Sequence, residues 1–188
     1  VFADRNKVEK EETFELASAA RDRFLFELSM PRPADVATRR ALVFDTRFHD
    51  ADALIQGVAA DVVDWARLSE AAAAIQHAVH ASATIERYAL DLWAASEDPA
   101  RFGVRLDDVD MQRLVIAGAS PRGMSALLRA ARVAAWLDGR AHLVPDDLRR
   151  VMPAALGHRI FLAPVYELRR NELAPKLVQG IMDRVAAP

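Results

Sequence analysis

The sequence predicts a mainly α-helical protein, and three observations favour this fold class. Hydrophobic residues make up 52% of the 188 residues and alanine is abundant, which is typical of a chain that folds around a core. Glycine and proline are sparse, with 7 and 9 residues, so few positions interrupt regular structure. Apolar residues also recur at helical spacing in several stretches. We therefore expect helices through most of the chain.

The beginning of the chain is predicted to differ from the rest. Val1–Ala3 and Phe24–Leu28 are candidate strands, separated by a charged stretch without a clear pattern. The sequence "MPRPAD" then indicates an extended linker, because two prolines placed so closely disfavour a helix. We place a domain boundary there, with 1–32 as a short N-terminal unit and 33–188 as a helical domain. The chain starts without a methionine and with an apolar stub, so we expect it to be a fragment.

The first part of the helical domain contains three predicted helices. Asp35 is a candidate N-cap for a helix that runs through about Phe44. Apolar residues then fall on one helical face over 68–79, and again over 85–93. Each stripe predicts a helix with one buried face.

Three later stretches are less uniform. The sequence "RLDDVDMQRLVIAG", 105–118, fits either a strand or a helix, and we favour the helix. In "VPDD", Pro145 and the two acidic residues suit the N-terminus of a short helix. A last helix is expected over about 173–185.

The clearest helix lies in "GASPRGMSALLRAARVAAWLDG". Ser120 is placed as the N-cap, Pro121 occupies the first helical position, and Gly139 follows the end. The residues predicted to face inward are Met124, Leu127, Leu128, Ala131 and Ala135. On the opposite side, Arg122, Arg129 and Arg132 form a basic stripe, for which a solvated helix face is the simplest interpretation.

The overall charge excludes several classes of partner. Twenty-five basic and 27 acidic residues give a net charge of −2, so no global field attracts nucleic acid or an anionic membrane. The basic stripe is short and lacks interleaved aromatic residues, and we therefore expect no nucleic-acid binding. No apolar run is long enough for a membrane span, and no signal peptide is visible, so we expect a cytoplasmic protein. Cysteine is absent, which excludes disulfides.

Two further patterns have part of the spacing of a chemical site. Gly118 and Gly123 have the spacing of a phosphate loop, but Met124 stands where that loop needs lysine and Pro121 removes an N–H group. His77 and His80 are one helical turn apart, yet no third ligand accompanies them and zinc needs three or four. We therefore predict neither a phosphate loop nor a metal site.

A long C-terminal stretch resembles a known family. "GASPRG", followed by "ALLRAARVAAWLDGRAHLVPDDLRRVMPAALGHRI", is similar to the helical lid of MoxR-type AAA+ ATPases. The shared features are the Pro-Arg pair, the alanine-rich helix, the "GR" turn, the Pro-Asp-Asp helix start and the terminal "L-x-H-R-I". In that family the arginine after the proline is the sensor 2 residue, so the resemblance implies this nucleotide-binding role for Arg122.

The N-terminal stretch extends the resemblance. "VFADRNKVEKEETFELASAARDRFLFEL" looks like the family's segment from the sensor 1 strand to the last core strand. On this resemblance Asn6 is the sensor 1 asparagine and Arg23 is the arginine finger, both catalytic. The sequence departs from the family at Lys7, where proline is usual, and at Glu12, where glycine is usual. The implied fold is a helical AAA+ lid preceded by a remnant of the α/β ATPase core.

The resemblance also implies a function for the intact protein. It would use ATP and Mg²⁺, assemble into a ring, a hexamer as in the family, and remodel or activate a partner in a chaperone-like way. The partner is often a von Willebrand factor A domain protein in this family. The sequence contains neither a Walker A nor a Walker B motif, so we expect the fragment alone not to hydrolyse ATP.

Two alternatives remain open from the sequence. A related AAA+ branch, such as the magnesium chelatase ATPase subunit or a helicase-like relative, shares the sensor 2 arrangement. A helical protein-interaction module that descends from such a lid, and no longer serves catalysis, is the alternative from another functional class. Substitution of Arg23 and Arg122 separates them, because the interaction module predicts no effect on ATP hydrolysis.

Overall fold

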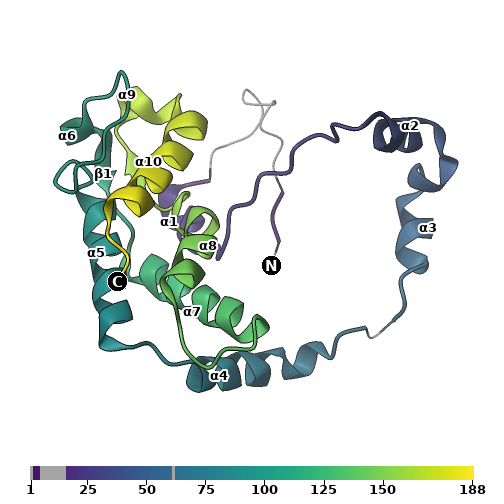
Figure 1. Ribbon diagram of the computed structural model, residues 1–188. Helices are drawn as coiled ribbons and strands as arrows, with labels where there is room; N and C mark the ends of the chain where they lie inside the picture. Colours follow the sequence, from purple (N-terminus) through teal and green to yellow (C-terminus); the bar gives the residue numbers. More distant parts are fainter. Residues whose placement is uncertain (1, 5–15, 61) are drawn as a thin grey trace. The chain divides into compact units, whose positions relative to one another are not determined.

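The structure is a computed structural model that describes residues 2–4, 16–60 and 62–188 (Figure 1). The described part is mainly helical, as predicted, with one small sheet. Contacts divide the chain into two compact units, one formed by Val1–Glu27 with Ile75–Pro188 and the other by Leu28–Ala74. The division into 1–32 and 33–188 stays a prediction. Among the described helices, none combines the length and the apolar character needed to cross a membrane.

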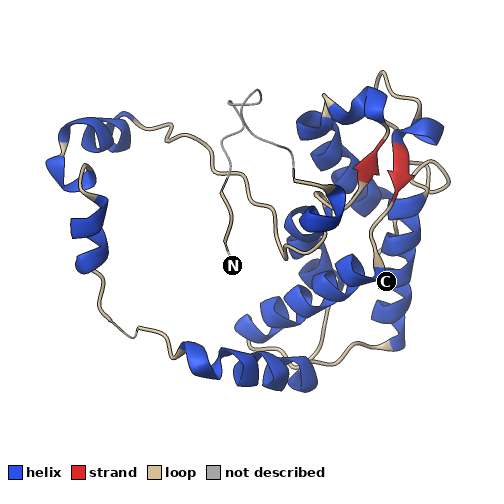
Figure 2. Cartoon of the chain, turned by 180° about the vertical axis from the view of Figure 1, so that it is seen from behind, coloured by secondary structure: helices blue, strands red, loops and turns tan. Residues whose placement is uncertain are grey.

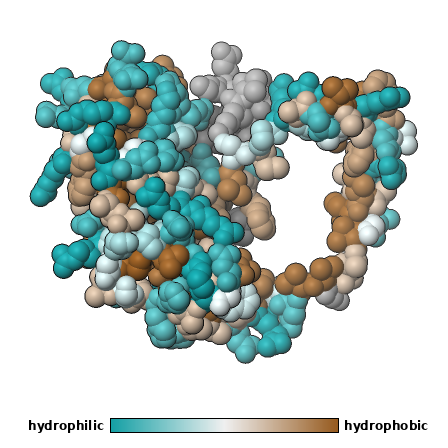
Figure 3. Space-filling view, in the orientation of Figure 1, coloured by the Kyte–Doolittle hydropathy of each residue, from teal (hydrophilic) through white to brown (hydrophobic). Residues whose placement is uncertain are grey.

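The unit Leu28–Ala74 consists of short capped helices. Its elements are α2 (Val36–Phe44), η1 (Thr46–Phe48), α3 (Ala51–Gln56), η2 (Trp65–Arg67) and the first turns of α4 (Leu68–Ala78). The predicted cap is confirmed, because the Asp35 carboxylate accepts a hydrogen bond of 2.7 Å from the Thr38 N–H. None of α2, η1, α3 and η2 contains a buried residue, and apolar side chains such as Phe44 and Ile55 stay exposed. Figure 3 shows hydrophobic side chains, in brown, on the surface of this unit. Local capping, rather than a core, organises these helices.

The larger unit holds the remaining helices and the sheet. Its elements are α1 (Ser18–Arg21), α5 (Ala83–Glu97), α6 (Met111–Leu114), β1 (Val115–Ala117), α7 (Pro121–Leu137), α8 (Pro145–Leu156), β2 (Phe161–Leu162), α9 (Pro164–Glu167) and α10 (Arg170–Arg184). The strands β1 and β2 pair antiparallel, with Val115 opposite Leu162 (Figure 2). The helix favoured for 105–118 is therefore wrong over β1, where β-branched Val115 and Ile116 suit a strand.

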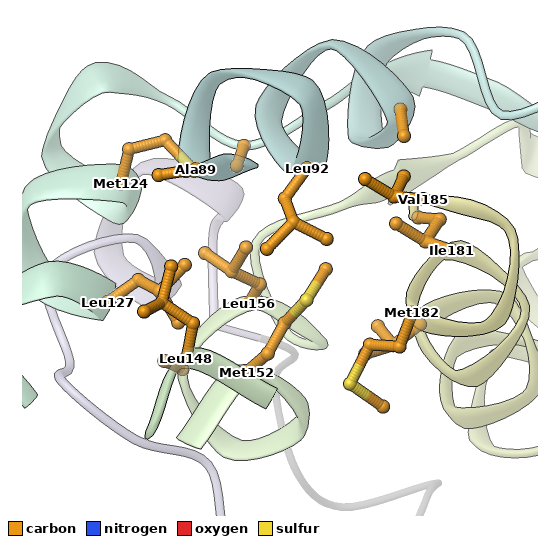
Figure 4. Packing of buried hydrophobic residues seen from close by; sticks show 14 of the residues in the cluster. Ala89, Leu92, Met124, Leu127, Leu148, Met152, Leu156, Ile181, Met182 and Val185 are labelled. Carbon is orange, nitrogen blue, oxygen red and sulfur yellow. The ribbon is translucent and has the colours of Figure 1, made fainter. Parts of the chain in front are cut away.

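The core of this unit is formed by α5, α7, α8 and α10. Leu92, Leu127, Met152 and Ile181 each come from one of these helices, and Figure 4 shows their side chains grouped in one cluster. All four are 0% exposed. The alanine-rich face of α7 packs on α8, since small side chains allow the two helices to lie close together.

The predicted inward face of α7 is confirmed for four residues, while Leu128 is only partly buried. The four buried residues are Met124, Leu127, Ala131 and Ala135. On the other face Arg129 is exposed, as expected for a solvated stripe. Arg132 is half-buried instead, and its Nη1 donates to the Gln76 side chain at 3.4 Å.

A partly buried ion pair fixes the turn between α7 and α8. Gly139 has a φ of 75°, a conformation that favours glycine, and so ends α7. Arg140 then donates two hydrogen bonds of 2.6 Å to the Asp147 carboxylate, which also accepts from the Val144 N–H. Burial raises the pKa of Asp147, but the hydrogen bonds from Arg140 and Val144 outweigh this effect and hold it below its usual value. The start of α8 is thereby tied to the end of α7.

The candidate strand at Phe24–Leu28 does not form. Of the candidate strand Val1–Ala3, the described residues Phe2 and Ala3 do not belong to a strand either. The carbonyl groups of Phe24 and Leu25 accept hydrogen bonds from the Arg159 side chain instead of from a neighbouring strand. The Glu27 N–H donates to the Ala154 carbonyl at 2.9 Å. Contacts with the end of α8 therefore satisfy this backbone, because no core strand lies beside it in the described part of the chain.

Candidate functional site

The first turn of α7 presents Arg122 to solvent. The Ser120 hydroxyl accepts a hydrogen bond of 3.0 Å from the Gly123 N–H, and Pro121 occupies the first turn, which confirms the predicted helix start. Arg122 comes directly after this proline, and its side chain is 61% exposed. The helix end therefore holds a guanidinium in a defined place where most of its donors remain available.

The Asp22 carboxylate lies directly beside this turn. Its Oδ2 accepts a hydrogen bond of 3.1 Å from Arg122 Nη1, and its Oδ1 accepts one of 2.8 Å from the Ser120 hydroxyl. Arg159 Nε lies 3.3 Å from the same Oδ1. The Asp22 side chain is only 12% exposed, so this carboxylate is a mostly buried centre shared by two arginines and one serine.

Arg159 joins Asp22 and the following residues to the end of α8. It is 1% exposed. Its guanidinium donates to the carbonyl of Asp22 at 3.1 Å and to that of Leu25 at 3.0 Å, and also to the carbonyls of Phe24 and Ala155. Burial lowers the pKa of Arg159, whereas the carboxylate of Asp22 raises it. This side chain therefore holds the segment that carries Arg23 in place.

Gly123 is required by the same packing. A Cβ atom built on Gly123 would lie 2.7 Å from Arg159 Cδ, closer than real side chains approach. The glycine of "SPRG" thus leaves room for the buried arginine beneath α7. Any larger residue would displace Arg159 or the first turn of the helix.

His158 adds a second buried contact to this segment. It is 4% exposed, and its Nε2 lies 3.0 Å from the Phe24 carbonyl. Since a carbonyl only accepts, Nε2 carries the hydrogen and donates. Its Nδ1 has no hydrogen-bond partner in the part of the chain that the structure describes. Burial lowers the pKa of His158 below its ordinary value of 6.5, and the neutral ring is favoured.

The free energy of unfolding is expected to fall as the pH is lowered through about 6.5. The pKa of His158 is lower in the folded chain than in the unfolded chain, so the unfolded chain takes up the proton first. The contribution of His158 to the free energy of unfolding is therefore fully present above the unfolded pKa. It is lost as the pH falls towards the folded pKa. Urea unfolding at about pH 7.5 and about pH 5.5 measures the loss. His158→Gln should reduce this loss, whereas substitution of exposed His142 should leave it unchanged.

Arg23 follows Asp22 and has an exposed side chain. Its backbone N–H donates to the Ala20 carbonyl at 3.1 Å, which fixes the turn after α1. Among the described residues, no acidic side chain lies within ion-pair distance of the Arg23 guanidinium. Asn6 lies outside the described residues. Arg122 thus contacts the carboxylate of Asp22, and Arg23 is the next residue along the chain, while Asn6 stays a prediction.

The chain is similar to known proteins in sequence and in fold. The AAA lid domain family matches residues 111–180, which include α7, α8 and most of α10. The chain is 54% identical over 188 residues to protein MoxR of Methylorubrum extorquens, covering 100% of this chain and 55% of that protein. Over its whole length the chain is therefore similar to a protein named MoxR, and its C-terminal part matches the AAA lid domain. It is also 30% identical over 191 residues to chaperone MoxR1 of Mycobacterium tuberculosis, covering 46% of that protein.

A solved structure shows the same fold as this chain. It is a crystal structure of an ATPase candidate from Cytophaga hutchinsonii, with a TM-score of 0.67 and 21% sequence identity. The match covers 98% of this chain and 52% of that chain. The chain thus spans about half the length of the curated MoxR relatives and of this structure.

Sequence reasoning missed three residues of this candidate site, namely Asp22, His158 and Arg159. Each lies in a stretch that carried the family resemblance, Asp22 in "DRF" and the other two in "GHRI". For Arg159 the available signal was a charged residue directly before the apolar Ile160 and Phe161, which indicates a buried polar group that needs a partner. Asp22 stands between two arginines and gave no such signal. Which partner each residue has depends on contacts across the fold, such as that between Arg159 and Asp22.

No metal centre is found in the described part of the chain. His77 and His80 are exposed, and no group of three or more His, Asp or Glu residues there could hold a metal ion. The His80 backbone instead pairs with the segment after Arg140, its N–H donating to the Ala141 carbonyl at 3.0 Å. The described residues therefore offer no ligand set for Mg²⁺.

Proposed function

We propose that this chain is part of an ATP-hydrolysing MoxR-type ring, in which Arg122 contacts the nucleotide and Arg23 completes an active site on a neighbouring subunit. One observation carries the proposal. Arg122 is held at the start of α7 with its side chain 61% exposed, although the positive end of a helix dipole is an unfavourable place for a cation. The single contact with the Asp22 carboxylate offsets part of this unfavourable interaction, and an anionic ligand on the exposed side of Arg122 would offset more of it.

The chemistry of arginine supports both roles. The planar guanidinium can donate two parallel hydrogen bonds to phosphate oxygens, and it stays charged at physiological pH. During phosphoryl transfer, negative charge develops on the γ-phosphoryl oxygens, and a fixed cation there lowers the barrier. Arg23 has an exposed side chain on a segment fixed by Arg159, so little ordering is needed when it reaches a phosphate.

Ring assembly follows from the finger role. A side chain that acts on a neighbour requires a head-to-tail interface, which closes into a ring, here a hexamer as in the family. Asn6 would orient the attacking water in the same site. We infer that 1–32 belongs to the α/β core and 33–188 to the lid, which moves with nucleotide state.

The partner protein is proposed from the similarity to named relatives. The Mycobacterium tuberculosis relative is named a chaperone, which supports a chaperone-like remodelling function here. A von Willebrand factor A domain protein is the expected partner, and the cytoplasm the expected location. ATP turnover in the ring would drive lid movement, which changes the surface presented to that partner.

ATP turnover by the full-length polypeptide tests the proposal. We expect hydrolysis whose rate per subunit rises with protein concentration as the ring forms, and no hydrolysis by the 188-residue chain alone. A full-length polypeptide that assembles but neither binds nor hydrolyses ATP would contradict the proposal. It would then favour the non-catalytic interaction module.

A further inference from the structure

Arg122 and Arg159 share the Asp22 carboxylate but hold it in different ways. Arg159 is 1% exposed and also donates to several backbone carbonyls, so it cannot leave without exposing unpaired buried groups. Arg122 is 61% exposed and contacts Asp22 through a single nitrogen, Nη1, at 3.1 Å. Asp22 therefore has one fixed partner and one partner that can leave.

Departure of Arg122 would cost little. Ion pairs with an exposed partner contribute little to stability, because water replaces the lost contact on the exposed side. After the departure, Asp22 would still accept from the Ser120 hydroxyl at 2.8 Å and lie 3.3 Å from Arg159 Nε. The buried carboxylate would thus remain paired. Nothing in the geometry requires Asp22 to move with Arg122.

The charge of this cluster favours an anion as the competing ligand. One carboxylate between the two guanidiniums of Arg122 and Arg159 leaves a net positive charge. The first turn of α7 adds the partial positive charge of a helix N-terminus. A phosphate group offers several charged oxygens to the fork of Arg122, whereas Asp22 offers it only Oδ2.

We propose that Asp22 is the resting partner of Arg122 and that a nucleotide phosphate takes its place when nucleotide binds. This inference rests on the proposed function, because it needs Arg122 to reach a nucleotide. Asp22 is a positioning residue that acts through Arg122. Since Asp22 directly precedes Arg23, each exchange also changes one of the contacts that hold the finger segment.

Nucleotide affinity of the full-length polypeptide tests the exchange, with a non-hydrolysable ATP analogue as the probe. Asp22→Asn removes the competing charge, and the analogue should bind about two- to fivefold more tightly, the worth of one exposed ion pair. Arg122→Ala should weaken binding. In that background Asp22→Asn should have no further effect, because the residue it releases is absent. A merely structural role of Asp22 predicts weaker binding in both backgrounds.

The control is Asp138→Asn, at the other end of α7. Asp138 is an exposed carboxylate that pairs with Arg140 and Arg150, and its loss should leave the affinity unchanged. If Arg122→Ala does not weaken binding, the proposed function itself fails. If Arg122→Ala weakens binding but Asp22→Asn does not tighten it, only the exchange is wrong.

A structural comparison covers the case in which Asp22→Asn does not fold. Structures of the wild-type full-length polypeptide, without nucleotide and with the analogue, require no variant. The contact between Arg122 Nη1 and Asp22 Oδ2 should stay near 3.1 Å without nucleotide and be broken in its presence. An intact contact in the nucleotide-bound state overturns the proposal.

Discussion

Arg23→Ala is expected to lower the ATP turnover number of the full-length ring by a factor of about 10³ to 10⁵, the usual worth of an arginine finger. The reason is electrostatic. Arg23 is exposed, follows the buried Asp22, and is not paired with an acidic residue in the described part of the chain, so its charge is available to a neighbour's γ-phosphoryl group. Steady-state ATP hydrolysis on assembled rings measures the effect.

Two matched variants make this result specific to the finger. Arg129→Ala removes another exposed arginine, on the solvated face of α7, and should leave turnover within about twofold of the wild-type value, as for a surface position. Arg23→Lys keeps the charge but loses the planar fork, so it should recover only part of the activity. Equal losses for Arg23→Ala and Arg129→Ala would count against the finger assignment.

Arg159→Met is expected to lower the free energy of unfolding by about 3–5 kcal/mol, the typical cost of removing one partner of a buried ion pair. Methionine keeps much of the apolar stem but leaves Asp22 without its fixed partner. It also leaves the carbonyls of Phe24 and Leu25 without their hydrogen bonds from this side chain. Urea unfolding followed by circular dichroism measures the change.

Arg150→Met is the control for that measurement. Arg150 lies in α8, the helix that precedes Arg159 in the chain. Its side chain is 59% exposed and pairs with the exposed Asp138, at 3.3 Å. Its loss should change the unfolding free energy by less than about 0.5 kcal/mol. A small effect of Arg159→Met, similar to that of Arg150→Met, would mean that Arg159 does not anchor the Arg23 segment.

The features predicted best from the sequence follow local rules. The start of α7 depends on Ser120 and Pro121, and its end on Gly139, so three residues close to the helix specify its limits. The cap at Asp35 is of the same kind. The alanine-rich stripe of α7 likewise predicted its buried face, because helical periodicity is a local property.

The features that the sequence did not predict depend on distant partners. The segment Val115–Ala117 becomes a strand because Phe161–Leu162 pairs with it, and Phe24–Leu28 does not because Arg159 binds its carbonyls. The role of Asp22 is of the same kind, since Arg159 lies 137 residues further along the chain. No local pattern around Asp22 identifies the arginines that share its carboxylate.

Complementation between two inactive variants tests the central claim, that Arg23 acts on a neighbouring subunit, most directly. One full-length variant carries Arg23→Ala, and the other keeps Arg23 but has its own nucleotide site disabled outside the 188 residues of this chain. Mixed rings should recover up to about a quarter of wild-type turnover, because an intact site then adjoins an intact finger at random positions in the ring. Mixed rings that stay as inactive as the separate variants would contradict the account.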